Sequence, residues 1–268
     1  MTLLNSKTTI VVCSKDYTDA LMLLKSTNIL NLLDSVPVVL CFFHDSIKSY
    51  SHKNLKIIKG QKNGIYSSFN SAIKQVETSH YLIIGDDDNY IGNKLNFDSI
   101  NNIIDENSIL FLPVKKGRKV YSYFKKKNWN KLVIGHFPSH SGGLIIPKKA
   151  HDIIGFYDTK KFKLLSDSLF IRKVINSNQF VELYMDKIFF NIGTNGASAN
   201  FKKSLLELYN LRKTLETTTR LSNLMNYFFL SSKFIAFSFL SKTVKPIYRL
   251  SIYYINSLSS LALLLGKE

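Results

Sequence analysis

The sequence predicts an α/β fold in which a mostly parallel central sheet is flanked by helices and followed by a helical C-terminal extension. Two observations lead to this prediction. Short runs rich in β-branched and aromatic residues alternate with helical patterns through the first 200 residues, which is typical of a doubly wound sheet. Beyond residue 200 the strand-like runs stop, and long apolar segments with scattered lysines replace them.

Four strands and two helices are expected before residue 86. The strand-like apolar runs are Thr8–Ser14, Val36–Phe43, Leu55–Lys59 and Tyr81–Gly85. Asp19–Leu33 carries apolar residues at helical spacing. From Gly64 onward, Ile65, Phe69, Ile73 and Val76 recur every three to four residues, which predicts an amphipathic helix.

Three further strands and one helix are expected in the rest of this region. The strand candidates are Ile109–Val114, Gly143–Ile146 and Ile188–Asn191. A helical pattern covers Asp167–Ile175, between the last two of them. We therefore expect one α/β domain over residues 1–200 and a helical region over residues 201–268.

Composition limits the class of protein. A chain of 268 residues with 45% hydrophobic residues can bury a full core and is not disordered. Cys13 and Cys41 lie inside apolar runs, which indicates buried free thiols in a reducing compartment and neither a disulfide framework nor a zinc site. The segment before the first apolar run, residues 1–7, is short and polar, and it lacks the basic and long apolar regions of a secretory signal. We therefore expect a cytoplasmic protein.

The formal net charge of +17 indicates an anionic partner. Nucleic acid, an anionic membrane face and phosphorylated small molecules are the candidates. A lysine- and asparagine-rich, AT-biased genome is an alternative source of much of this charge. Because the basic residues are dispersed and no nucleic-acid recognition motif is present, we expect no nucleic-acid partner.

Polar residues follow three of the expected strands. Ser14 and Asp16 stand at the end of the first strand, Asp45 follows the second, and Asp86–Asp88 follow the fourth. In open parallel sheets, ligands bind beyond the carboxyl ends of the strands. These residues therefore predict one ligand-binding crevice.

The three adjacent aspartates suit a metal ion. Asp86, Asp87 and Asp88 repel one another and cannot all be buried unpaired. A divalent cation that prefers oxygen ligands, Mg²⁺ or Mn²⁺, would relieve this repulsion and could bridge to a diphosphate. The alternative is a solvated acidic turn.

Several motifs, in the same order, resemble glycosyltransferase family 2. The stretch GQKNGIYSSFNSAIKQVETSHYLIIGDDDNYI (Gly60–Ile91) resembles that family's helix and the following strand, which ends in an Asp-x-Asp motif. Ser139–Val174 resembles the acceptor-side segment, and NIGTNGAS (Asn191–Ser198) resembles the closing Gly-Gly-(Ile/Val)-Ser element. The resemblance covers roughly residues 8 to 200.

This resemblance implies a GT-A fold and a hexosyltransferase activity. It implies an inverting transfer from a nucleoside-diphosphate sugar, a UDP-sugar in particular, to a hydroxyl group. The acceptor would be a lipid-linked or oligosaccharide substrate in the synthesis of a surface polysaccharide such as O-antigen or capsule. Residues 1–200 would then be the catalytic domain.

The resemblance also assigns roles to individual residues. The residues implied to face nucleotide, sugar or diphosphate are Ser14, Asp16, Asp45, Lys62, Gly64, Asn70, Asp86, Asp87 and His140. Asp86 and Asp88 match the Asp-x-Asp pair and would hold the metal, with Asp88 as its main ligand; with a register shift of one, Asp87 becomes the first member. Asp167 matches the catalytic base, which takes a proton from the acceptor hydroxyl. Its alternative is a helix N-cap.

The chain also departs from the family pattern. Cys13-Ser14-Lys15-Asp16-Tyr17 stands where Thr-Pro-x-Tyr-Asn is usual, and Ser141 replaces a glutamine. An inactive nucleotide-sugar binder or membrane scaffold therefore stays as an alternative. A basic nucleic-acid-binding protein is another, which the net charge of +17 suggests. A nucleotidyltransferase would be expected to carry a glycine-rich loop near the first strand, and the sequence has none.

The C-terminal region predicts attachment to an anionic membrane surface. Asn226–Leu240 and Leu250–Gly266 are strongly apolar and are flanked by basic residues, as expected for segments that lie in a membrane interface. The second has 17 residues without charge, short of the ~20 needed to span a bilayer. We expect a peripheral protein on the inner face of the cell membrane; a spanning segment or helices packed on the catalytic domain are the alternatives.

Overall fold

We describe a computed structural model of the chain. It describes residues 6–14, 22, 25, 29, 32–42, 52–61, 63–85, 88–91, 94–121, 141–193, 207, 210, 211 and 214. The chain divides into two compact units, and the elements named below belong to the first, which comprises Met1–Phe124 and Phe137–Ala199. Most of the second unit lies outside the described residues, so the division at residue 200 stays a prediction.

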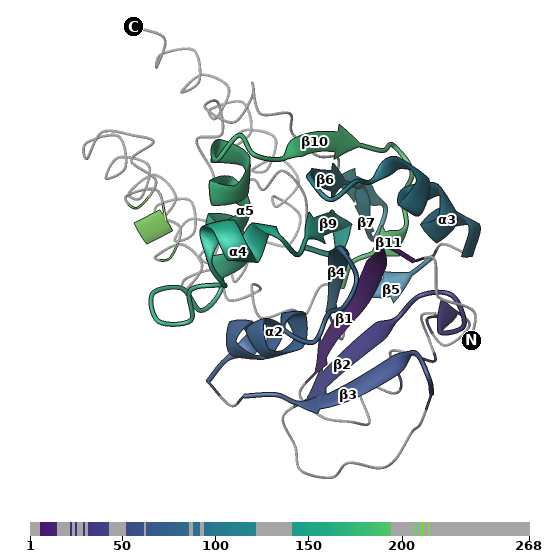
Figure 1. Ribbon diagram of the computed structural model, residues 1–268, viewed down its shortest axis with the longest axis horizontal. Helices are drawn as coiled ribbons and strands as arrows, with labels where there is room; N and C mark the ends of the chain where they lie inside the picture. The colour runs from purple at the N-terminus through teal and green to yellow at the C-terminus, as the bar shows by residue number, and fades with distance from the viewer. Residues whose placement is uncertain are drawn as a thin grey trace, which may run out of the picture. The chain divides into compact units, whose positions relative to one another are not determined.

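A large, mostly parallel sheet forms the centre of the first unit. Its described strands are ordered β10-β6-β9-β4-β1-β2-β3 (Figure 1). They are β1 (Thr8–Ser14), β2 (Val38–Phe42), β3 (Leu55–Lys59), β4 (His80–Gly85), β6 (Ser108–Phe111), β9 (Leu144–Pro147) and β10 (Val181–Tyr184). Among these strands β9 alone runs antiparallel to its neighbours, β4 and β6. The prediction of an α/β fold with a mostly parallel sheet is confirmed.

The described helices lie between the strands along the chain. They are α2 (Ile65–Ile73), α3 (Lys94–Ile103), α4 (Ala150–Ile154) and α5 (Ser166–Asn176). Helix α2 packs against β1 and β2, and it buries Phe69 and Ile73 as its apolar spacing predicts. The expected helix at Asp167–Ile175 is confirmed as α5. Most of the expected helix at Asp19–Leu33 lies outside the described residues.

A second, smaller sheet has the order β5-β11-β7-β8. Its strands are β5 (Asn89–Tyr90), β7 (Val114–Lys116), β8 (Lys119–Tyr121) and β11 (Phe190–Asn191). The expectation of one strand over Ile109–Val114 is wrong, because β6 ends at Phe111 and β7 begins at Val114 in the other sheet. Pro113 lies between the two strands, and proline has no backbone N–H to donate to a sheet.

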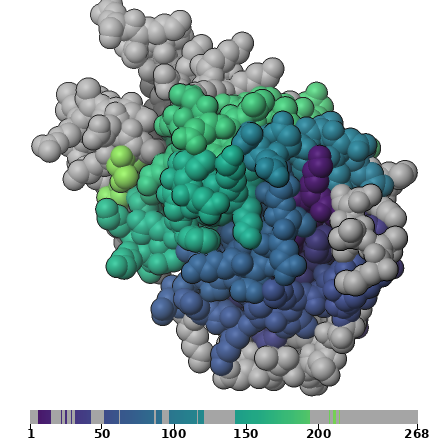
Figure 2. Space-filling model, viewed as in Figure 1, coloured from purple at the N-terminus to yellow at the C-terminus, as the bar shows by residue number. Residues whose placement is uncertain are grey.

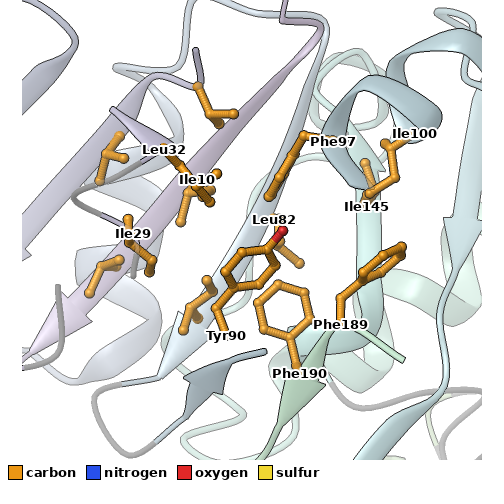
Figure 3. Close-up of a cluster of buried hydrophobic side chains, with 14 of the residues drawn as sticks. Ile10, Ile29, Leu32, Leu82, Tyr90, Phe97, Ile100, Ile145, Phe189 and Phe190 are labelled. Carbon is orange, nitrogen blue, oxygen red and sulfur yellow. The ribbon is translucent and has the colours of Figure 1, made fainter. Parts of the chain in front are cut away.

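The main hydrophobic core lies between the two sheets and α3. Figure 3 shows Ile10 and Leu82 from the large sheet facing Phe97 of α3 and Tyr90 and Phe190 of the small sheet. The ring of Tyr90 lies 5.7 Å from that of Phe97 and 5.3 Å from that of Phe190, centroid to centroid. Burial of each large apolar side chain stabilises the fold by about 1.5–3 kcal/mol. This core therefore holds the two sheets together as one unit.

Two thiols lie side by side in the large sheet. Cys13 on β1 is paired in register with Cys41 on β2. Both are buried thiols that no disulfide joins, as the apolar runs around them predict.

Among the described residues, no helix is long and apolar enough to cross a bilayer. The two apolar segments of the tail, Asn226–Leu240 and Leu250–Gly266, lie outside those residues.

Successive residues of β4 point to opposite faces of the sheet, so Tyr81 lies on the face opposite Leu82. There its hydroxyl lies 2.7 Å from Nε2 of His151 and 3.1 Å from the hydroxyl of Tyr157. Nδ1 of His151 lies 3.1 Å from the carbonyl oxygen of Gly155. A carbonyl only accepts, so Nδ1 carries the proton and Nε2 accepts from Tyr81. Burial lowers the pKa of His151 to about 4.

This buried histidine predicts a loss of stability in acid. The pKa of His151 lies below the ordinary 6.5, so its contribution is complete above pH 6.5 and is lost as the pH falls towards 4. The loss is up to about 3 kcal/mol. The urea midpoint should fall over this interval, and His151→Phe should flatten that fall. An equally steep fall of the midpoint in His151→Phe would contradict the assignment. Some fall should remain in this variant, because burial also lowers the pKa of His80.

Candidate active site

The ends of β1 and β4 form the edge at which a ligand site is expected. The two strands pair in parallel with Cys13 opposite Gly85, so Ser14 and the residues after Gly85 leave the sheet at the same edge. Ser14 is buried there. Of the other residues predicted for this edge, Asp16, Asp45, Asp86 and Asp87 lie outside the described residues, as do Lys62 and His140, which the resemblance assigns to the same site.

Asp88 is held in place by backbone groups from two distant parts of the chain. Its Oδ2 accepts the N–H of Gly85 at 2.9 Å, and its Oδ1 accepts the N–H of Gly193 at 3.1 Å. The residue is 4% exposed. Hydrogen bonds to a charged group contribute about 1.5–3 kcal/mol each. The carboxylate therefore holds the end of β4 against the segment that follows β11.

The carboxylate of Asp88 fits the role of a ligand for a hard cation. Two N–H groups fix its orientation, and each carboxylate oxygen has two lone pairs, of which one is used. Oxygen ligands of this kind suit Mg²⁺ or Mn²⁺. Within the described part of the chain no group of three or more His, Cys, Asp or Glu residues could hold a metal, and Asp86 and Asp87 are not in that part.

Asp167 lies in the first turn of α5 and is hydrogen-bonded to a tyrosine of α2. Its Oδ1 accepts the hydroxyl of Tyr66 at 2.8 Å and the N–H of Ser168 at 2.8 Å. The N-cap position of α5 is Leu165, so Asp167 is not the capping residue. The N-terminal turn of a helix favours a negative charge, which stabilises the ionised carboxylate.

Tyr66 was not singled out by the sequence, yet it contacts the candidate base directly. It is 6% exposed, and its hydroxyl lies 2.7 Å from the carbonyl oxygen of Leu164 as well as 2.8 Å from Asp167. Burial, followed by the charge of Asp167, raises the pKa of Tyr66 well above its ordinary value. The hydroxyl therefore stays protonated and acts as a donor to these oxygens.

Asn70 joins α2 to the segment that leads into α5. Its Nδ2 donates to the carbonyl oxygen of Tyr157 at 2.9 Å, and its Oδ1 accepts the N–H of Tyr157 at 3.1 Å. Residues four apart share one face of a helix, so Tyr66 and Asn70 face the same segment. Figure 2 shows α2, in blue, directly against the teal surface of α4 and the residues before α5.

Gly64 stands immediately before α2. Its φ of 107° lies in the left-handed region, which favours glycine. A Cβ at this position would meet no atom within 4 Å. The requirement for glycine is therefore conformational, and the space beside it is open.

Solved glycosyltransferases share this fold. The crystal structure of S. aureus TarS 1-349 superposes with a TM-score of 0.58 at 17% identity, covering 90% of this chain and 76% of that one. TarS 1-349 in complex with UDP-GlcNAc gives a TM-score of 0.57 at 20% identity, covering 90% and 77%. The mannosyltransferase PcManGT from Pyrobaculum calidifontis, in complex with GDP-Man and Mn²⁺, gives 0.54 at 11% identity, covering 98% and 88%.

These similarities confirm the GT-A-like fold. No protein-family model matches the chain, and no curated protein matches it in sequence. At identities of 11–20% the likeness concerns the fold, so membership of glycosyltransferase family 2 stays a prediction.

The two hydrogen bonds of Asn70 predict a large effect on stability. Asn70→Ala removes both partners of the Tyr157 backbone, and we expect the free energy of unfolding to fall by about 1–3 kcal/mol. Urea denaturation measures this change. Ser71→Ala is the matched control, because Ser71 makes a local hydrogen bond to the carbonyl oxygen of Ser67, and it should change stability by about 0.5 kcal/mol or less. Equal losses in both variants would contradict the role given to Asn70.

Proposed function

We propose that the chain is an inverting glycosyltransferase that moves a hexosyl residue from a UDP-sugar to an acceptor hydroxyl. The observation that supports it most is the pair Tyr66–Asp167. A carboxylate at a helix start, hydrogen-bonded by a buried and protonated tyrosine, is a fixed proton acceptor. The chain that carries this pair shares its fold with proteins solved in complex with UDP, with UDP-GlcNAc and with GDP-Man and Mn²⁺.

The donor diphosphate would bind at the carboxyl ends of β1 and β4. Asp88, together with Asp86, would hold Mg²⁺ or Mn²⁺, whose chemistry is to neutralise charge on the departing diphosphate. The other residues that we propose to line this donor site are Ser14, Asp16, Asp45, Lys62, Gly64, Asp87 and His140. Because both ends of the Asn70 amide bond to the backbone of Tyr157, we assign Asn70 to positioning the acceptor-side segment.

Asp167 would act as the base. As the acceptor oxygen bonds to the anomeric carbon, the bond from that carbon to the diphosphate breaks, and the hydroxyl proton passes to the Asp167 carboxylate. Attack on the face opposite the leaving group inverts the anomeric centre. Tyr66 holds Oδ1 of Asp167 and restricts rotation of the carboxylate, which keeps the base oriented before the acceptor arrives.

We further propose that the acceptor is a lipid-linked or oligosaccharide substrate in surface-polysaccharide synthesis and that the protein acts at the inner face of the membrane. The basic composition and the apolar tail support this proposal. An inactive nucleotide-sugar binder is the alternative, favoured by the departures around Ser14 and Ser141. Donor binding without turnover of any acceptor would identify it.

Calorimetric titration of UDP and GDP, with and without Mn²⁺, tests the donor site. We expect UDP to bind with Mn²⁺ and to lose affinity by about tenfold or more in Asp88→Asn, since a metal ligand is lost. Asp88→Asn retains one acceptor oxygen for the backbone N–H groups, whereas Asp88→Ala leaves both unpaired. Asp98→Asn, an exposed position on α3, is the control and should bind like the wild type. A wild-type protein that binds neither nucleotide with metal present would exclude the proposal.

The role of Asp167 is tested by the release of UDP from UDP-sugars in the presence of lipid-linked acceptors. Asp167→Asn should lower kcat by about 10²–10⁴ while UDP binding stays unchanged. Tyr66→Phe should lower kcat less and move the acidic limb of the pH–rate profile to higher pH, because the carboxylate loses a donor that favours its charged form. Tyr157→Phe removes a buried hydroxyl that bonds to Tyr81 and not to Asp167, and it should leave the limb in place. A shift of equal size in Tyr157→Phe would contradict the direct role of Tyr66.

A further inference from the structure

The start of the connection between α4 and α5 carries two exposed apolar side chains that the proposed donor site and base do not use. Ile153 of α4 is 38% exposed, and Phe156, three residues later, is 43% exposed. Gly155 stands between them with a φ of 88°, in the left-handed region that favours glycine. A single exposed apolar residue is ordinary, but two of them at one turn form a small apolar surface. We call these two side chains the α4 patch.

Packing beneath the patch holds the ring of Phe156 at the surface. This ring is stacked with that of His151, 4.8 Å apart between centroids, and His151 is stacked in turn with Phe170 of α5 at 4.4 Å. Both His151 and Phe170 are buried, so the layer under Phe156 is already filled. Because protein interiors are close-packed, the ring cannot sink further into the fold. Its exposed part is therefore a fixed feature of the surface.

Three exposed lysines lie around the patch. Nζ of Lys74, at the end of α2, lies 5.1 Å from the centroid of the Phe156 ring. Lys160 and Lys161 are exposed in the turn that follows, whose backbone N–H groups donate to Asp158 at 2.9 Å. In the part of the chain that the structure describes, no ion pair engages any of these lysines. Their charges are therefore available to an anionic partner.

The patch lies on the same side of the large sheet as the candidate base. Near the start of α2, Tyr66 contacts Asp167, and just past its end Lys74 contacts Phe156. Tyr66 and Lys74 stand eight residues apart, so they share one face of the helix. With a rise of 1.5 Å per residue, about 12 Å separates the two contacts along the helix axis. Figure 1 shows the connection from α4 to α5 as a loop at the left of the view, beside α2.

We propose that the α4 patch is a docking surface for an anionic lipid bilayer. The two apolar side chains of the patch enter the headgroup region, and the three lysines around it lie next to lipid phosphates. Exposed apolar side chains beside cations are the combination that binds the surface of such a membrane. Charge complementarity favours this occupant, because a neutral partner would gain nothing from the lysines.

This contact belongs to the catalytic unit itself and is separate from the attachment proposed for the C-terminal tail. Ile153 and Phe156 are part of the first compact unit, whereas residues 200–268 belong to the second. A bilayer at the patch would lie about 12 Å from the contact between Tyr66 and Asp167 along α2, within reach of a lipid-linked acceptor. The use of the surface for acceptor delivery rests on the proposed function, but the contact with the bilayer does not.

A fluorophore on the patch tests the contact locally, since the tail is proposed to bind the same membrane. Ile153→Cys in the full chain is labelled with a polarity-sensitive thiol dye; Cys13 and Cys41 are buried, and labelling of the wild type measures their uptake. Phe156 is left intact because it packs on His151. Phosphatidylglycerol vesicles should move the emission to shorter wavelength and phosphatidylcholine vesicles should not, and added salt should weaken the response.

Matched variants locate the contact. A label at Ile103→Cys should not respond: this isoleucine is 44% exposed on α3, which packs on the face of the large sheet opposite α4. In the labelled chain, Lys160→Gln/Lys161→Gln should raise the lipid concentration for half of the response by about five- to twentyfold, since each lysine at an anionic surface contributes about fivefold. Lys53→Gln/Lys56→Gln, which removes two exposed lysines at the edge strand β3, should leave this concentration unchanged.

Three outcomes would overturn the proposal. The first is a label at position 153 that does not respond, even in protein that sediments with the vesicles. The second is an equal response at position 103 or with phosphatidylcholine, and the third is an equal effect of the two glutamine pairs. Titration of UDP with Mn²⁺ and without vesicles separates the two proposals. A chain that binds UDP without a response at position 153 loses only the docking surface, and a chain that responds without binding UDP loses only the proposed function.

Discussion

The carboxylate of Asp88 connects the parts of the fold that form the site. Taking a carboxylate out of water is costly unless hydrogen bonds replace the lost hydration. At 4% exposure Asp88 depends on the N–H groups of Gly85 and Gly193. The chain must therefore turn directly from the end of β4 into β5, and β11 must bring Gly193 back to the same point. These two hydrogen bonds, together with the apolar core between the sheets, fix the small sheet against the central strands.

Helix α2 makes the second connection. Tyr66 and Asn70, one turn apart, reach across to the segment that runs from Tyr157 to Asp167. The rings of Tyr66 and Tyr157 lie 5.5 Å apart. The hydroxyl of Tyr157 is hydrogen-bonded to that of Tyr81, which is hydrogen-bonded in turn to His151. Each hydrogen bond contributes only about 1 kcal/mol to stability, but together these bonds fix the position of the start of α5. The carboxylate of Asp167 is thereby oriented by groups that are themselves buried.

The apolar pattern located most of the elements, because burial of a strand or a helix face leaves a local period in the sequence. Thr8–Ser14 and Leu55–Lys59 form the expected strands, and Phe69 and Ile73 lie buried on the expected helix. The pattern does not carry strand direction, so the antiparallel course of β9 could not be predicted. It also could not divide Ile109–Val114 between two sheets, since both halves are equally apolar. The two-residue strands β5 and β11 are too short to show any period.

The sequence by itself determined the α/β class, the approximate strands and the cluster of acidic residues after the fourth strand. These depend on contacts between near neighbours and on the alternation of apolar and polar residues. Only the tertiary structure decided that Tyr66 contacts Asp167, that Asn70 bonds to Tyr157, and that Gly193 closes on Asp88. The partners in these three pairs stand 101, 87 and 105 residues apart. No local period links residues at such separations, because it is the packing of whole elements that brings them together.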